Sequence, residues 1–266
     1  MDKKYWKDIM LEAAEIDFKE PLPVPDEEFL NVWSSHYAAV SRLTRPGNKI
    51  LEMGTGYAVL AAGLGRQSGS RVLGLEHPSR AYFFSEEYLD FLRRSNVTLV
   101  GADFREGLPL RPESVSQVYC CDVLEHLEPD LAVQILFEIN RVLTSDGELI
   151  LSTPNLNRFS NMIRLLKGHT VNPPIDCGRY GRTCGHIREF SPLEMYTFLQ
   201  RAGFNTLRFR YELNPFFTAH AFGNDNVWSN SQAGWINRLT RLSYLVFPRL
   251  GDEMYILARK DKAVKA

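Results

Sequence analysis

The chain has 266 residues, of which 44% are hydrophobic and 24% charged, and its formal net charge is −1. This composition excludes a disordered or collagen-like chain, and the near-neutral charge argues against a dedicated nucleic-acid-binding protein. No apolar run approaches the ~18 residues of a membrane span, and the N-terminal residues lack the apolar segment of a signal peptide. Four cysteines without an export signal indicate reduced thiols, so we expect a cytoplasmic location.

Charge is distributed unevenly along the chain. Residues 1–153 carry 15 basic and 24 acidic side chains, a balance of −9, whereas residues 154–190 carry 6 and 2, a balance of +4. Residues 204–266 carry 9 and 5, again +4. The asymmetry predicts that the two parts of the chain bind different ligands.

Hydrophobic periodicity predicts an α/β fold. Residues 1–45 favour two helices separated by a proline-rich segment at 21–25, and we expect them to form an N-terminal helical cap. From residue 46 to 266, short apolar strands alternate with helical patterns. The expected strands are 49–53, 71–76, 97–100, 115–121, 148–152, 205–211 and 252–259, and the expected helices between them are 57–66, 79–94, 131–143 and 191–202. Such alternation is typical of a doubly wound, mostly parallel sheet with helices on both faces.

Two inserts interrupt this alternation, at 154–190 and 213–250. The first is rich in proline and glycine, and a loop of this length in a compact domain is usually a functional segment or a lid. The second includes an amphipathic, basic helix at 235–247. This helix favours packing on the core or against a second copy in a homodimer, and contact with a membrane surface is the remaining alternative.

A glycine-rich turn follows the first expected strand, in the segment Glu52-Met53-Gly54-Thr55-Gly56-Tyr57-Ala58. Such a turn lets a ligand approach the backbone next to a helix N-terminus. The dinucleotide pattern G-x-G-x-x-G requires glycine where this chain has Val59, which disfavours a nicotinamide-dependent dehydrogenase. The segment instead resembles the E/D-x-G-x-G-x-G motif of class I S-adenosylmethionine (SAM)-dependent methyltransferases, with Ala58 in place of the third glycine.

Later segments resemble the same family in the same order. Glu76 ends the second strand, residues 101–104 (GADF) follow the third, residues 122–126 (DVLEH) follow the fourth, and residues 186–204 contain H-x-R-x-F…A-G-F. The resemblance implies a seven-stranded sheet with its last strand antiparallel, and an enzyme that uses SAM. It implies that Glu52 contacts the methionine ammonium, Glu76 the ribose hydroxyls and Asp103 the adenine amino group. The full implied cofactor set is Glu52, Gly54, Gly56, Glu76, Asp103, Phe104 and Asp122.

The acceptor is less constrained by the sequence. A hydroxyl acceptor benefits from a base that titrates near pH 7, which favours histidine. His126 and His186 are both expected at the carboxyl edge of the sheet, where they act either structurally or as catalytic residues, and His186 is the stronger candidate. Six basic residues of the first insert favour an anionic acceptor: Arg158, Arg164, Lys167, Arg179, Arg182 and Arg188.

We therefore expect methyl transfer to a hydroxyl of a sugar, nucleotide-sugar or glycan precursor. The alternatives are a quinone-like or amine small molecule, and a non-catalytic subunit that keeps the SAM-binding fold. Cys177 and Cys184 with His186 do not follow a known zinc spacing, so no metal is expected. The segment 172–175 (NPPI) resembles a motif of amino-group methyltransferases, but that motif follows the fourth strand, whereas this segment follows the fifth expected strand.

Overall fold

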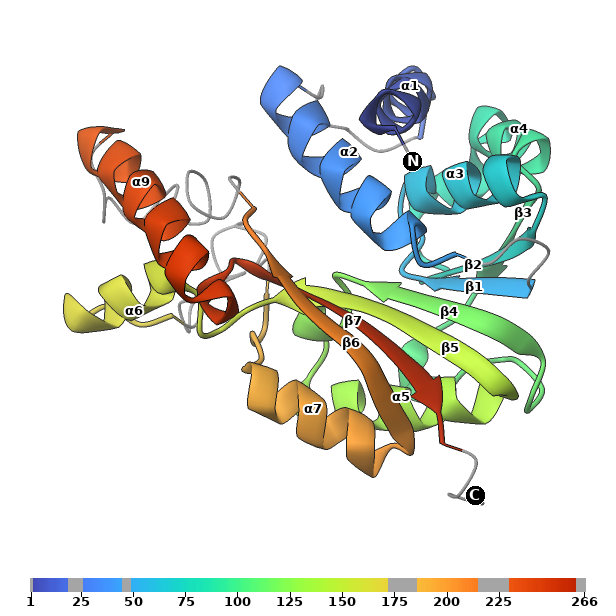
Figure 1. Ribbon diagram of the computed structural model, residues 1–266. Helices are drawn as coiled ribbons and strands as arrows, with labels where there is room; N and C mark the ends of the chain where they lie inside the picture. Colours follow the sequence, from blue (N-terminus) through green and yellow to red (C-terminus); the bar gives the residue numbers. More distant parts are fainter. Residues whose placement is uncertain (1, 19–25, 45–48, 172–185, 215–229, 262–266) are drawn as a thin grey trace.

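A seven-stranded sheet forms the centre of the computed structural model, which describes residues 2–18, 26–44, 49–171, 186–214 and 230–261 (Figure 1). The strand order is β3-β2-β1-β4-β5-β7-β6. The strands are β1 (Lys49–Met53), β2 (Arg71–Glu76), β3 (Val97–Gly101), β4 (Val115–Cys121), β5 (Leu143–Pro154), β6 (Phe204–Glu212) and β7 (Glu253–Lys260). The first five strands pair in parallel, and β7 pairs antiparallel with both β5 and β6. The predicted sheet with its antiparallel last strand is confirmed.

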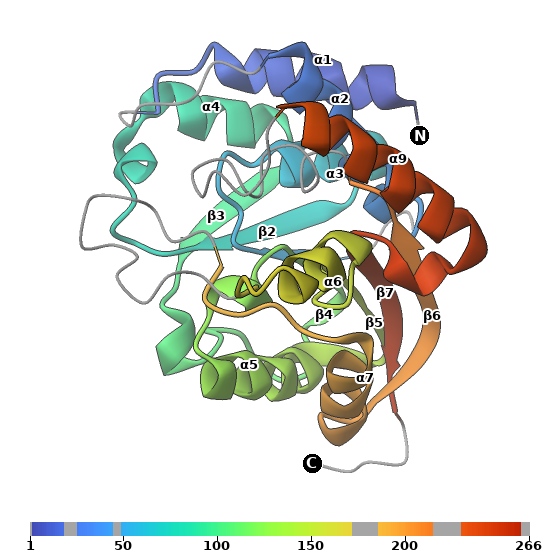
Figure 2. The same cartoon turned by 90° about the vertical axis from the view of Figure 1, so that its left-hand side faces the viewer.

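Helices cover both faces of the sheet (Figures 1 and 2). One face carries α1 (Lys3–Ala14), α2 (Glu27–Ser41), α3 (Val59–Ser68) and α4 (Glu86–Arg94). The opposite face carries α5 (Pro129–Val142) and α7 (Pro192–Arg201), while α6 (Phe159–Leu166) and α9 (Asn230–Val246) lie beside each other at one end of the sheet. Each covered face has its own cluster of buried apolar side chains.

The first helix is fixed to the third by a close contact. The indole of Trp6 is fully buried, and a Cβ atom added at Gly63 of α3 would lie 2.0 Å from its ring. Only glycine therefore lets α1 approach α3 this closely. Through this contact α1 packs on the same apolar layer as α3 and α4.

Several element boundaries differ from those expected. Tyr57 and Ala58 stay in the turn, with Ala58 at a φ of 57°, so α3 begins at Val59. The helix expected at 79–94 is divided, because the Ser85 side chain accepts a hydrogen bond from the Tyr88 amide and starts α4 after a short 3₁₀ turn. The first insert contains α6, which was not expected. The helix start at Ser191 is confirmed, with a full capping box to Glu194.

Among the residues that the structure describes, no helix is both long enough and apolar enough to cross a membrane.

Candidate active site

The glycine-rich turn is held against the neighbouring strand. Gly54 and Gly56 have φ values of 67° and 51°, a left-handed conformation that glycine adopts without steric cost. The amides of Gly54 and Thr55 both donate to the carbonyl of Leu75, at 2.9 and 3.1 Å. The turn thus leaves the carboxyl end of β1 in a fixed geometry and directs the chain into α3.

Glu76 at the end of β2 reaches back to this turn. Its Oε2 accepts a hydrogen bond from the Gly56 amide at 2.9 Å, and its Oε1 accepts one from the His77 amide at 2.7 Å. The Tyr88 hydroxyl donates to the Gly56 carbonyl at 2.8 Å, so both backbone groups of Gly56 are bonded. Glu76 therefore orders the turn as well as presenting a carboxylate beside it.

A cavity of about 330 Å³ opens next to the turn. Its walls come from helices α1 and α2 on one side and from the carboxyl ends of β1 and β4 on the other. The lining residues are Met10, Ala13, Ala14, Phe18, Phe29, Trp33, His36, Tyr37, Glu52, Gly54, Thr55, Gly56, Tyr57, Val59, Leu60, Cys121 and Asp122. Four of the seven residues expected to bind the cofactor thus meet in this cavity: Glu52, Gly54, Gly56 and Asp122.

Glu52 is the most confined carboxyl group of the cavity wall. Its side chain is buried, and its Oε2 has no hydrogen-bond partner. Burial, followed by the nearby charge of Glu76, raises the pKa of Glu52 well above its ordinary value. A buried carboxyl group without a counter-ion is costly, so this position suits a cationic ligand group such as an ammonium.

A second polar group of the cavity was not foreseen from the sequence. His36 of α2 lies with its Nδ1 in a hydrogen bond of 2.8 Å to the Tyr255 hydroxyl and its Nε2 3.5 Å from Asp122 Oδ2. The Nδ1 atom also lies 3.6 Å from Glu253 Oε1. His36 is buried, its Nε2 has no hydrogen-bond partner, and burial lowers its pKa below the ordinary value. The imidazole is therefore neutral at pH 7.

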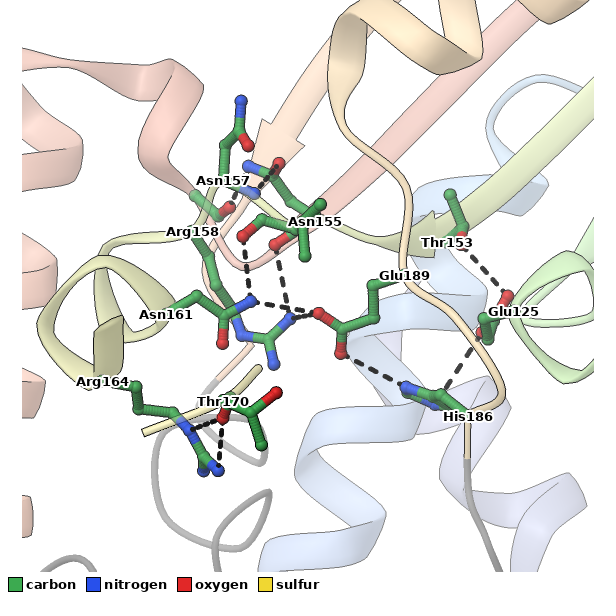
Figure 3. A network of polar contacts seen from close by, with 12 residues as sticks. Glu125, Thr153, Asn155, Asn157, Arg158, Asn161, Arg164, Thr170, His186 and Glu189 are labelled. Atoms are coloured by element: carbon green, nitrogen blue, oxygen red, sulfur yellow. Dashed lines mark hydrogen bonds and ion pairs between the residues drawn. The ribbon is translucent and has the colours of Figure 1, made fainter. Parts of the chain in front are cut away.

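The two histidines singled out in the sequence lie together elsewhere on the same edge. Their ring centroids are 5.1 Å apart, but neither ring lines the cavity. Figure 3 shows His186 between two carboxyl groups, with its Nδ1 3.3 Å from Glu189 Oε1 and its Nε2 4.0 Å from Glu125 Oε1. Glu125 is fully buried, and burial followed by the charge of Asp122 raises its pKa.

Glu189 connects this group to the first insert (Figure 3). It pairs with the buried guanidinium of Arg158 and accepts a hydrogen bond of 3.1 Å from Asn161. Burial alone would raise the pKa of Glu189, but the charge of Arg158 and hydrogen bonds from His186 and Arg158 lower it to about 2. The carboxylate is therefore ionised at pH 7 and orients the His186 ring.

At the adenine end of the expected cofactor site, the carboxylate of Asp103 is hydrogen-bonded within the chain. Asp103 follows β3 as expected, but both of its carboxylate oxygens accept hydrogen bonds from Arg105 Nε at 3.0 Å. These bonds keep the pKa of Asp103 low. Phe104 is partly buried against the core. Asp103, Phe104 and Glu76 lie outside the cavity, so their contacts with adenosine stay predictions.

The basic side chains of the first insert have partners within the chain. Arg158 pairs with Glu189, Arg188 pairs with Glu194, and Arg164 donates to the Thr170 carbonyl at 3.1 and 3.2 Å. These three arginines therefore give no support to an anionic acceptor. Arg179 and Arg182, the NPPI segment and both Cys177 and Cys184 lie outside the described residues.

Two groups of side chains in the described part of the chain have the spacing of metal ligands. His36, Asp122 and Glu253 form one, and Glu125, His126 and His186 the other, each with ligand atoms within 4.8 Å of one another. The first group is also bonded to Tyr255 and Asn214, and the second to Thr153 and Glu189. Hydrogen bonding thus accounts for much of each arrangement.

Comparison with known families finds a methyltransferase domain in the chain. The family model described as a methyltransferase domain matches residues 51–151, which include the glycine-rich turn, Glu76, Asp103 and Asp122. The chain contains a methyltransferase domain, and its fold is that of class I SAM-dependent methyltransferases. No curated protein sequence matches it.

Solved structures share the fold of this methyltransferase over most of its length. A SAM-dependent methyltransferase from Archaeoglobus fulgidus has a TM-score of 0.54 at 16% identity, covering 88% of this chain and 95% of that one. A SAM-dependent methyltransferase from Mesorhizobium loti has 0.55 at 15%, covering 85% and 98%. The [4+2]-cyclase SpnF has 0.59 at 17%, covering 93% and 86%. At such identities the likeness shows the fold alone.

The residues of the turn and cavity fit SAM. The glycines at 54 and 56 leave the backbone open to a ligand, and Glu52 offers a buried carboxyl group, whose Oε2 has no hydrogen-bond partner, for the cationic methionine end. Glu76 stands at the end of β2, where the sequence resemblance implies a contact with the ribose. We therefore propose that SAM binds in this cavity and along the edge that continues towards β3.

Proposed function

We propose that the enzyme works in the cytoplasm and transfers the methyl group to a hydroxyl of a small polar acceptor, with sugars, nucleotide-sugars and glycan precursors the first class to test. The observation that carries the proposal is His36. Its neutral, buried ring lies on the cavity wall, and its Nε2 has no hydrogen-bond partner. A group of this kind can accept the proton of a hydroxyl as that oxygen attacks.

The surroundings of His36 suit a general base. When the proton sits on Nδ1 and is donated to Tyr255, the lone pair of Nε2 is available to the acceptor. The carboxyl group of Asp122 lies 3.5 Å from Nε2 and would stabilise the charge that the ring gains. Bound SAM supplies an activated methyl group on a sulfonium centre. The chain's task is to align the acceptor with it and to exclude water.

His186 and His126 stay candidates for acceptor contacts. Glu189 holds the His186 ring in the way that an orienting carboxylate holds a catalytic base. Because neither histidine lines the cavity, we propose that they contact the part of the acceptor that lies outside it.

An amine acceptor is the second candidate, and the carboxyl groups of the wall favour it. Glu52 and Asp122 would attract an ammonium group. Transfer then still requires a base, because a protonated amine has no lone pair to attack with. His36 is available for this role as well. The two candidate functions therefore use the same base and differ in the acceptor.

The test compares His36→Asn with His186→Asn in a panel of sugars, nucleotide-sugars and amines, following S-adenosylhomocysteine release. We expect His36→Asn to lower kcat about 100-fold with SAM affinity and thermal stability near those of the parent. His186→Asn should raise KM more than it lowers kcat. Full turnover by His36→Asn would exclude His36 as the base, and turnover of amines alone would replace the hydroxyl proposal.

The pH profile gives an independent measurement. Burial lowers the pKa of His36 from its usual 6.5, so the ring stays neutral when the pH falls to that value. The acid limb of kcat/KM should therefore begin below pH 6.5 and disappear in His36→Asn. An acid limb centred above pH 6.5 would point to a different base.

A further inference from the structure

We propose that the surface formed by α6 and α9 docks on an anionic lipid surface. We call this surface the α6–α9 face. It consists of the exposed apolar side chains of the two helices: Met162, Leu165, Leu166, Trp235, Leu239, Leu242, Leu245, Val246 and, directly after α9, Phe247. The proposal does not depend on which acceptor is methylated.

The exposure of these side chains is unusual for a soluble domain. In the described part of the chain, sixteen large hydrophobic residues are exposed, and nine of them belong to this face. Leu166 is 86% exposed and Leu245 76%. Scattered apolar residues on a surface need no explanation, but a contiguous group indicates an interaction site.

The spacing on α9 gathers its apolar residues on one side. Trp235, Leu239, Leu242 and Val246 follow each other at intervals of four, three and four residues, which places them along one stripe of a helix. Ile236 and Thr240, on the other side, are buried. The helix therefore packs on the protein through one side and exposes an apolar stripe on the other. Of the arrangements expected from the sequence, packing on the core alone does not account for this stripe.

The two helices that carry this face lie side by side. They contact each other, and both views show them together at the same end of the sheet (Figures 1 and 2). The helix α6 starts one residue after Arg158, and its Asn161 bonds to Glu189, which orients His186. The α6–α9 face thus adjoins the polar network of Figure 3.

The charges on this face favour an anionic lipid surface over a second copy of the chain. Neither helix contains an aspartate or glutamate, whereas Lys167, Arg238, Arg241 and Arg249 are exposed beside the apolar residues. The guanidinium of Arg238 lies 5.7 Å from the centre of the Trp235 ring, an aromatic and basic pair suited to a membrane interface. Two copies of the same face would bring like charges together in a symmetric dimer. Anionic headgroups complement both the charge and the apolar stripe.

The test is co-sedimentation of the purified enzyme with phosphatidylcholine vesicles, with and without phosphatidylglycerol. We expect binding to the anionic vesicles that weakens as salt is added, and an at least tenfold lower partition coefficient for Leu242→Glu/Leu245→Glu. The matched control is Leu193→Glu/Leu207→Glu, which changes two exposed leucines of α7 and β6 that lie outside the α6–α9 face. Arg238→Glu/Arg241→Glu should abolish the preference for anionic lipid.

The possible results distinguish a lipid surface from a second copy of the chain. The proposal is overturned if the parent, Leu242→Glu/Leu245→Glu and Leu193→Glu/Leu207→Glu have equal partition coefficients. It is also overturned if the parent binds neither kind of vesicle. A dimer in light scattering that Leu242→Glu/Leu245→Glu dissociates, without vesicle binding by the parent, assigns the face to a second copy instead. Unchanged SAM affinity in calorimetry shows that the variants are folded.

Discussion

Replacing Arg158 with leucine should lower the free energy of unfolding by about 3–5 kcal/mol, the usual cost of removing one partner from a buried ion pair. Arg158 is 3% exposed and its partner Glu189 8%, so the carboxylate left behind has almost no access to water. Asn161 and His186 still contact it but do not replace the guanidinium group. The measurement is urea denaturation of the parent and variant at pH 7.

The second variant for this pair is Arg158→Leu/Glu189→Leu. Because it removes both charges, it should recover part of the free energy of unfolding that Arg158→Leu loses.

The pH dependence of the stabilisation by this pair follows from the pKa of Glu189, which is about 2 in the folded chain against an ordinary 4.5. Its stabilisation is present above pH 4.5 and is lost as the pH falls from 4.5 towards 2. A loss below 1 kcal/mol in Arg158→Leu would show that the pair contributes no more than a surface ion pair.

Glu76→Ala should weaken SAM binding by about 100-fold to 1000-fold, because each hydrogen bond to a charged group contributes about 1.5–3 kcal/mol. The variant removes the carboxylate expected to bind the ribose hydroxyls. It also removes the acceptor of the Gly56 and His77 amides, so the turn loses an internal restraint. The measurement is calorimetric titration with SAM and S-adenosylhomocysteine.

Two controls separate these contributions. Glu76→Gln keeps an acceptor oxygen for the Gly56 amide but loses the charge. Its SAM affinity should therefore lie between those of the parent and Glu76→Ala. Glu86→Ala changes an exposed glutamate at the start of α4 and should bind SAM like the parent. SAM affinity that survives in Glu76→Ala would mean that the ribose is bound by other residues.

Much of the fold could be predicted from local patterns. The apolar strands and the glycines at 54 and 56 leave a strong signal because backbone geometry and burial restrict which residues are tolerated there. The capping box at Ser191 is equally local, since its two hydrogen bonds join residues three positions apart. Glu52 was singled out by its resemblance to a short family motif, and the structure places it in the cavity wall.

The acceptor side could not be predicted in this way. His36 meets Tyr255 across 219 positions of sequence, and neither residue lies in a recognisable motif. The partners of Arg158 and Arg188 are likewise set by tertiary packing, so two of the basic residues expected at an anionic acceptor pair instead with carboxylates of the chain. The helix α6 was missed because prolines and glycines around it dominate the composition of the insert.

The position of β7 has a consequence for synthesis on the ribosome. This strand lies between β5 and β6, yet it is translated after both, and it supplies the Glu253 and Tyr255 that surround His36. Until its residues emerge, the nascent chain exposes an unpaired edge of β5 to chaperones and proteases. The His36 wall of the cavity is likewise complete only when residues translated near the beginning meet those translated near the end. Acquisition of this wall therefore marks the completion of the sheet during biosynthesis.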